Sequence, residues 1–180
     1  MIESYPVRDA LDLFLVSVPG CPTATAKRAL IQSAQEFCET TGVHREPDKL
    51  PAVDSQLLYE FDAPSKDLMV LRLADLSHSG TAIRNMLELD SNARDTMISA
   101  TLILGPSRGA KRIWAPLIDQ YGEALAAGAL RRLLMQQGTD YYNPQQSAYE
   151  AGLFADFLHN ARINIEQPRT VKPRGRQWAC

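Results

Sequence analysis

The spacing of apolar residues predicts a helix over residues 23–41. Positions three, four or seven residues apart would form one buried stripe: Ala26, Leu30, Ile31, Ala34, Phe37 and Cys38. Thr23 or Thr25 is placed to cap the start of this helix. Gly42 follows at the position where a helix commonly ends in the left-handed region. A turn rich in proline and glycine, residues 19–22, precedes the helix.

The charges of this helix oppose its dipole. Lys27 and Arg28 come early, near the positive end, whereas Glu36 and Glu39 come late. Each misplaced charge costs about 0.3–1 kcal/mol. We therefore expect either that packing holds this helix in place or that its early bases face a partner.

Shorter apolar patterns surround this helix. Residues 7–18 predict a short helix followed by an extended exit. Residues 56–61, 68–76 and 95–104 predict strands, because apolar and polar positions alternate there. The last of these is the clearest, and residues 81–89 fit either a strand or one helical turn. Three or four short strands suffice for a small antiparallel sheet, which needs a covering layer on one face.

The last third of the chain predicts an antiparallel pair of helices, over residues 116–137 and 144–166. Pro116 suits the first turn of the former, and its middle, residues 124–129, consists only of alanine, glycine and leucine. Such small residues let another helix approach closely. Asn143 and Gln146 form a capping-box pattern at the start of the second helix.

These elements predict an α+β fold, in which the first helix and the last two pack against one face of a small antiparallel β-sheet. One set of large side chains is expected in the core: Leu30, Phe37, Leu125, Leu133 and Phe157. No internal repeat or low-complexity stretch interrupts the pattern.

Composition narrows the classes of protein that fit. The 180 residues are 45% hydrophobic and 22% charged, which is ordinary for a globular protein and excludes a disordered chain. The formal charge of -2 argues against a small basic nucleic-acid binder. Three cysteines without a pairing motif fit a reducing compartment. We expect no signal peptide and no membrane span, because the longest apolar runs are about five residues.

Motifs for catalysis or metal binding are not found in the sequence. Residues 105–109 look like a phosphate-binding loop but lack its lysine, so we interpret them as a turn that leaves a strand. His78 lies between two serines, yet adjacent residues rarely present a nucleophile and its base to each other. Cys38 and Phe37 are interpreted as core residues. We expect no enzyme activity, no cofactor and no metal.

Five segments, in this order and spacing, resemble small head-to-tail adaptor (neck) proteins of tailed bacteriophages. These segments are residues 18–22, 35–41, 104–108, 123–134 and 143–144. The resemblance extends over most of the chain, and the order of helix, sheet and helix pair is also similar to the tail tubular A (gatekeeper) proteins.

The resemblance implies a structural virion protein without enzymatic activity, made in the host cytoplasm and located in the neck between capsid and tail. It implies a homo-oligomeric ring, twelve-fold, that attaches below the portal protein. Such a ring extends the DNA channel, through which viral DNA passes without sequence-specific binding, and provides the docking surface for a downstream tail or nozzle protein. The alanine-rich helix would suit close packing of neighbouring subunits, and a net-negative body would let DNA slide past.

The organisation expected is one adaptor domain, residues 1–167, followed by a basic C-terminal arm, residues 168–180. The arm holds no acid, so the rest of the chain carries about -6. We expect the arm to be disordered or extended in the free chain and to order on the portal. The residues expected to dock there are Arg169, Lys172, Arg174, Arg176 and Trp178. A frayed, solubilising terminus is the alternative for this segment.

Two other classes of function stay open. The chain fits a cytoplasmic binding or regulatory module without catalytic activity, which would usually be a dimer. It also fits an enzyme whose site follows no known motif, which would require a pocket with converging acids or histidines.

Overall fold

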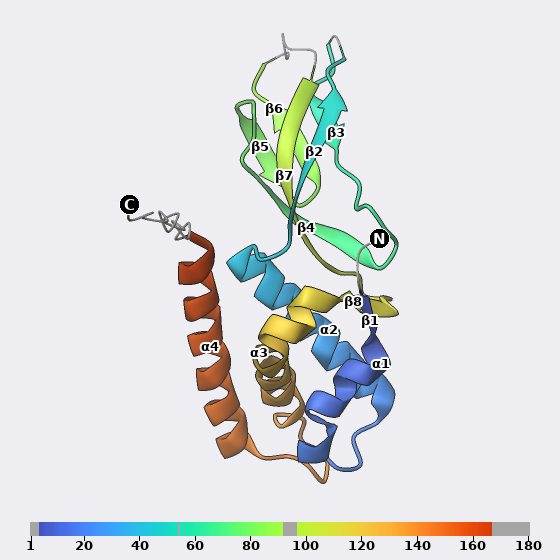
Figure 1. Cartoon of the computed structure of the whole chain (residues 1–180), viewed down its shortest axis with the longest axis vertical. Helices are drawn as coiled ribbons and strands as arrows, with labels where there is room; N and C mark the ends of the chain where they lie inside the picture. Colours follow the sequence, from blue (N-terminus) through green and yellow to red (C-terminus); the bar gives the residue numbers. More distant parts are fainter. Residues whose placement is uncertain (1–3, 54, 92–96, 167–180) are drawn as a thin grey trace, which may run out of the picture.

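The computed structural model describes residues 4–53, 55–91 and 97–166, and it confirms an α+β fold with antiparallel sheets. Figure 1 shows a helical body at one end of the molecule and a β-module at the other. The β-module is one contiguous segment of chain, from Arg45 to Pro106, between the second and third helices.

Three long helices make up the helical body: α2 (Thr23–Thr41), α3 (Ala115–Leu133) and α4 (Pro144–Glu166). All three predictions of a helix are confirmed, and α3 ends a few residues earlier than expected. The apolar stripe predicted for α2 is buried in full. Leu30, Phe37, Leu125 and Leu133 are each completely buried in the helical core, as predicted.

The predicted helix ends are partly correct. Gly42 ends α2 with a φ of 65°, and its N–H donates to the carbonyl of Cys38 at 2.8 Å. Asn143 caps α4, because its Oδ1 accepts the N–H of Gln146 at 3.0 Å. The threonine cap of α2 is wrong: Pro22 occupies the N-cap position, and no side chain caps this end.

The N-terminal segment forms short elements that pack on the helices. A strand, β1 (Ser4–Pro6), pairs antiparallel with β8 (Arg112–Trp114) just before α3. One helical turn follows, α1 (Val7–Ala10), and then two 3₁₀ turns, η1 (Leu11–Leu13) and η2 (Leu15–Ser17). The short helix is thus confirmed, whereas the extended exit is wrong. Leu11, Phe14 and Val18 are spaced three to four residues apart, and all three are buried in the core of the helical body.

The β-module consists of two three-stranded antiparallel sheets. The first has the order β2 (Arg45–Pro51), β7 (Met97–Pro106), β4 (Leu68–Ala74). The second has the order β3 (Leu58–Glu60), β6 (Met86–Leu89), β5 (Gly80–Ile83). The ambiguous residues 81–89 therefore form a hairpin.

A second hydrophobic core lies between these sheets. It takes residues from both, including Tyr59 and Leu87 from one sheet and Ile98 and Leu102 from the other. The expected arrangement, with helices covering one sheet face, is thus not what the protein adopts: the two sheets largely cover each other. The helices reach the first sheet through α2, where Gln35 donates to the carbonyl of Pro106 at 2.8 Å.

One predicted core residue is misplaced. Phe157 is half-buried at the rim of the helical core, and Phe154, one turn earlier on α4, is the completely buried residue. A helix that packs on one side only buries a narrow stripe, and Phe157 lies at the edge of that stripe.

Candidate functional site

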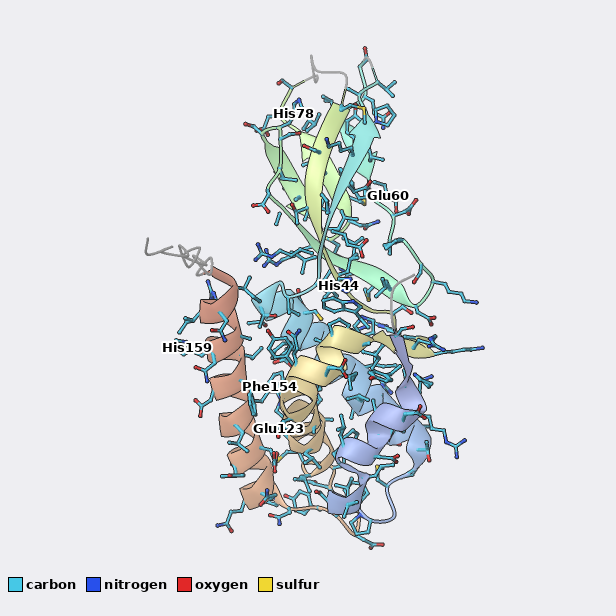
Figure 2. All side chains as sticks on the ribbon, viewed as in Figure 1. His44, Glu60, His78, Glu123, Phe154 and His159 are labelled. Atoms are coloured by element: carbon cyan, nitrogen blue, oxygen red, sulfur yellow. The ribbon has the colours of Figure 1, made fainter. Side chains whose placement is uncertain are left out.

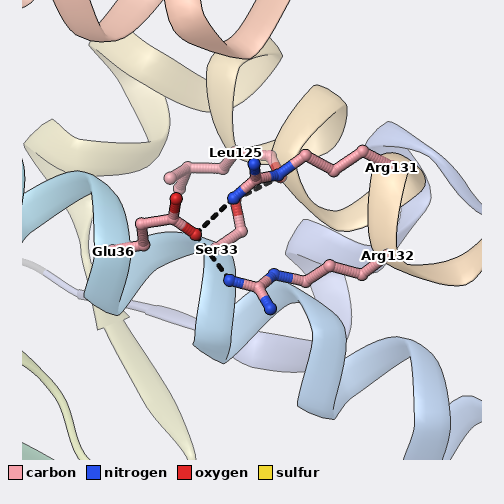
Figure 3. Close-up of polar contacts among 5 residues, drawn as sticks. All are labelled: Ser33, Glu36, Leu125, Arg131 and Arg132. Carbon is pink, nitrogen blue, oxygen red and sulfur yellow. Dashed lines mark hydrogen bonds and ion pairs between the residues drawn. The ribbon is translucent and has the colours of Figure 1, made fainter. Parts of the chain in front are cut away.

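A cluster of two arginines and a glutamate joins α2 to α3. Figure 3 shows both guanidinium groups directed at one carboxylate, that of Glu36. Arg132 Nη2 lies 2.5 Å from Glu36 Oε2, and Arg131 Nη2 contacts the same oxygen. Arg131 also lies over the ring of Phe154, 4.5 Å from its centroid. The negative charge of Glu36, which is unfavourable near the C-terminal end of α2, is therefore paired with two arginines from the last turn of α3.

The alanine- and glycine-rich middle of α3 is buried within the chain. At Gly128 an added Cβ would lie 2.1 Å from Ser33 Oγ and 2.7 Å from a ring carbon of Phe154. Ser33 Oγ in turn donates to the carbonyl of Leu125 at 3.0 Å (Figure 3). These small residues let α2 and α4 approach α3, so they are not available to pack against a neighbouring subunit, which is the role we expected for them from the sequence.

The early bases of α2 line a groove. Two adjoining hollows of about 470 Å³ each run along this helix, and both include Ala24, Arg28 and Gln32 in their lining. Lys27 and Arg108 contribute to the first hollow, and Arg132 contributes to the second. We call this surface the basic groove: Lys27, Arg28, Arg108 and Arg132. No acidic residue of the described chain lines either hollow.

Hydrogen bonds hold the walls of the basic groove. Gln35, a lining residue, fixes the end of β7 through Pro106, and Arg108 follows two residues later in the turn. The Ser107 N–H and hydroxyl donate to the carbonyls of Asp67 and Lys66, at 2.8 and 2.9 Å. On the other side, Glu36 holds Arg132. The groove is therefore a preformed feature of packed elements.

A different surface lies on the outer side of the β3–β6–β5 sheet. The strand register places Leu58, Glu88 and Thr81 in one row across it. Glu60, Met86 and Ile83 form the next row on the same side. We call these six residues the outer sheet face. Its apolar members are open to solvent, with 49% of Leu58, 68% of Ile83 and 39% of Met86 exposed.

Charge on the outer sheet face is mainly negative. Glu60 and Glu88 are both exposed, and Asn85 Nδ2 donates to Glu60 Oε1 at 3.0 Å. Asp62 comes after β3 and Asp90 comes after β6, and both are exposed as well. Among the residues described, the basic residue of this sheet is Arg84, which lies in the hairpin turn between β5 and β6.

Candidate groups for catalysis are scattered. Figure 2 shows His78 in the β-module, His44 near its junction with the helices and His159 on α4, well apart from one another. Ser77 and His78 share a hydrogen bond of 2.7 Å on the exposed surface, and Ser77 Oγ also accepts the Ser99 N–H. No group of three or more metal-ligating side chains occurs in the described parts of the chain.

The buried thiol and imidazole have structural surroundings. Cys38 is completely buried, as predicted, and burial raises the pKa of its thiol to about 12. His44 is buried where α2 gives way to β2, and its ring stacks on Trp114 at 4.2 Å between centroids. Burial lowers the pKa of His44, although Glu46, 3.3 Å from its Nε2, opposes that shift. The turn predicted at residues 105–109 is confirmed, since β7 ends at Pro106.

The residues predicted to dock on the portal all lie outside the described residues: Arg169, Lys172, Arg174, Arg176 and Trp178. The basic groove was only partly foreseen. The dipole-opposing placement of Lys27 and Arg28 signalled a partner, but Arg108 and Arg132 join them only through tertiary packing. The outer sheet face was missed, because its rows depend on the strand register.

Among the described helices, none is both long and apolar enough to cross a membrane. Neither the models of known protein families nor the sequences of curated proteins give a match to this chain.

Proposed function

We propose that this chain is a structural virion protein, a head-to-tail adaptor that forms a ring below the portal of a tailed bacteriophage. In this role it extends the DNA channel and gives the tail proteins a surface on which to dock. It acts without catalysis, cofactor or metal, and its place is the neck between capsid and tail.

The observation that carries this proposal is the presence of two unlike surfaces on one chain. The helical body has a basic groove, and the β-module has an exposed apolar face with carboxylates. An adaptor contacts different partners on different sides, and a ring needs a contact between two unlike patches. A binding module with one ligand requires only one such surface.

Charge supports the passage of DNA as the second part of this role. Without the basic residues of 168–180, the chain carries about -6. Binding to DNA is driven largely by lysine and arginine side chains that neutralise phosphates. A ring of subunits with net negative charge therefore binds the duplex only weakly. DNA then moves through the channel without sequence-specific contacts.

The test is disruption of the gene in its phage, followed by electron microscopy of the lysate. We expect DNA-filled heads and free tails that do not join, and a copy of the gene supplied in trans should restore complete particles. Normal tailed particles from the disrupted phage would exclude the adaptor role and favour a cytoplasmic binding or regulatory module.

A further inference from the structure

We propose that the basic groove of one copy receives the outer sheet face of the next copy, so that the chain associates head to tail. This inference rests on the proposed function for the expectation that copies assemble. It names the two surfaces and the residues that meet.

The first support is uncompensated positive charge in the groove. Lys27, Arg28 and Arg108 form no ion pair with any carboxylate of the described residues, and only Arg132 has an acidic partner, Glu36. Arg28 and Arg108 are exposed, and Lys27 is half-buried. Several like charges around one hollow create a positive potential there, which attracts an acidic surface.

The second support is the apolar content of the outer sheet face. Leu58, Ile83 and Met86 stand on neighbouring strands with 39–68% of their surface exposed. Exposed apolar side chains on neighbouring strands of one sheet face, bordered by charge, are typical of a protein-interaction site. The carboxylates of Glu60 and Glu88 lie within the same two rows.

Charge decides which surfaces can meet. Two outer sheet faces would bring Glu60 and Glu88 of each copy together, and two basic grooves would oppose eight bases, four from each copy. A groove against a face pairs basic residues with carboxylates, and the exposed Ala24 in the groove lining is available for apolar contact. Because the two patches differ, the contact is heterologous and leaves one groove and one face free to continue the assembly.

The experiment uses two charge-reversed variants of the full chain. The groove variant carries Lys27→Glu and Arg28→Glu, and the face variant carries Glu60→Lys and Glu88→Lys. Association is measured by sedimentation velocity over a range of protein concentrations, at low salt and at high salt. We expect the wild type to associate and to dissociate as salt rises, because exposed charges are screened over about 8–10 Å at physiological ionic strength.

Each variant alone should associate about tenfold more weakly or worse, because like charges then face each other across the contact. An equimolar mixture of the two should regain association. In that mixture the acidic groove of one variant meets the basic face of the other, and the remaining groove and face are native. Recovery on mixing is therefore specific to a groove–face contact.

Controls separate this effect from misfolding and from net charge. The matched variants Arg8→Glu with Lys49→Glu, and Asp119→Lys with Asp156→Lys, reverse exposed charges outside both surfaces and should associate like the wild type. The milder variants Lys27→Gln with Arg28→Gln, and Glu60→Gln with Glu88→Gln, cover the case in which a reversal prevents folding. Circular dichroism melts check that each variant is folded.

Three results would overturn the inference: a wild type that stays monomeric throughout, variants that associate normally, or a mixture that fails to recover. Retention of a labelled DNA duplex by the wild type but not by the groove variant would reassign the groove to nucleic acid. None of these bears on the gene-disruption test, because a ring can be built on the portal through other contacts. Conversely, the variants could regain association on mixing while the phage with the disrupted gene still made normal tailed particles. That pair of results would refute the adaptor role and leave the groove–face contact standing.

Discussion

Gly128 sets the distance between three helices. No side chain fits there, since even a methyl group would overlap both Ser33 of α2 and Phe154 of α4. The same contact brings Arg131 over the ring of Phe154 and places Glu36 within reach of both arginines. A single small residue thus positions the α2–α3 cluster that forms one wall of the basic groove.

Replacement of this glycine should destabilise the protein. We expect Gly128→Ala to lower the free energy of unfolding by about 1–3 kcal/mol, because the added methyl group forces α2 and α4 away from α3. Gly152 of α4 is the matched control, since an added Cβ there meets nothing within 4 Å. Gly152→Ala should raise the free energy of unfolding by about 0.5–1 kcal/mol, because alanine is the better helix former. Urea denaturation of both variants measures the difference, and equal effects would contradict this view of Gly128.

Two phenylalanines of α4 should differ in their contribution to stability. Phe154 is 1% exposed in the helical core, whereas Phe157 is half-buried and lines a surface groove. We expect Phe154→Ala to cost about 3–5 kcal/mol, because it leaves a cavity, and Phe157→Ala to cost clearly less. Thermal and urea unfolding compare the two, and a larger loss at Phe157 would contradict the assignment of Phe154, rather than Phe157, to the helical core.

At the scale of elements, the helices were predictable and several strands were not. Each long helix has an apolar stripe of helical period that is buried against its neighbours, so its pattern is visible in the sequence. Strand β2 was missed because Pro47 and Pro51, together with Arg45, Asp48 and Lys49, give it a loop-like composition. The structure places it at the edge of its sheet, where proline is tolerated and one side faces water.

The sequence predicts only parts of the two candidate surfaces, because each surface joins residues that are far apart along the chain. A single helix can show that Lys27 and Arg28 are oddly placed, but only packing brings Arg108 from the turn after β7 beside them. The outer sheet face requires the register of three short strands, and no periodicity in so few residues fixes a register.

The junction between α2 and β2 should make stability depend on pH. Burial holds the pKa of His44 below its ordinary value of 6.5, so the unfolded chain takes up a proton at higher pH than the folded chain does. The stability due to neutral His44 is therefore fully present above pH 6.5. It decreases as the pH falls from there to the lower pKa of the folded state. Urea unfolding at pH 7.5, 6.5 and 5.5 should show this decrease, and His44→Gln should reduce the slope. An unchanged slope in that variant would assign the pH dependence to other groups.

At the scale of the whole molecule, the two proposed contact surfaces belong to parts of the chain with separate hydrophobic cores. Helices α2 and α3 carry Lys27, Arg28 and Arg132 of the basic groove, whereas the apolar, acidic outer sheet face belongs to strands of the β-module, which has a hydrophobic core of its own. None of the six residues of the outer sheet face lines the basic groove, so changes on that face leave the groove lining intact. This separation is what makes the two charge-reversed variants independent probes of one contact.

From the proposed function we expect the basic C-terminal segment, residues 168–180, to attach this chain to the portal. Residues 168–180 carry four bases and no acid, and Trp178 offers a large apolar side chain suited to a pocket on a partner. We expect a chain without residues 168–180 to fail to join particles or to bind purified portal protein, and a circular dichroism melt checks that it is folded. Trp178→Ala should weaken binding through loss of the anchor, and glutamine in place of the four bases should remove its salt dependence. Normal assembly by the truncated chain would mean that the arm is only a solubilising terminus.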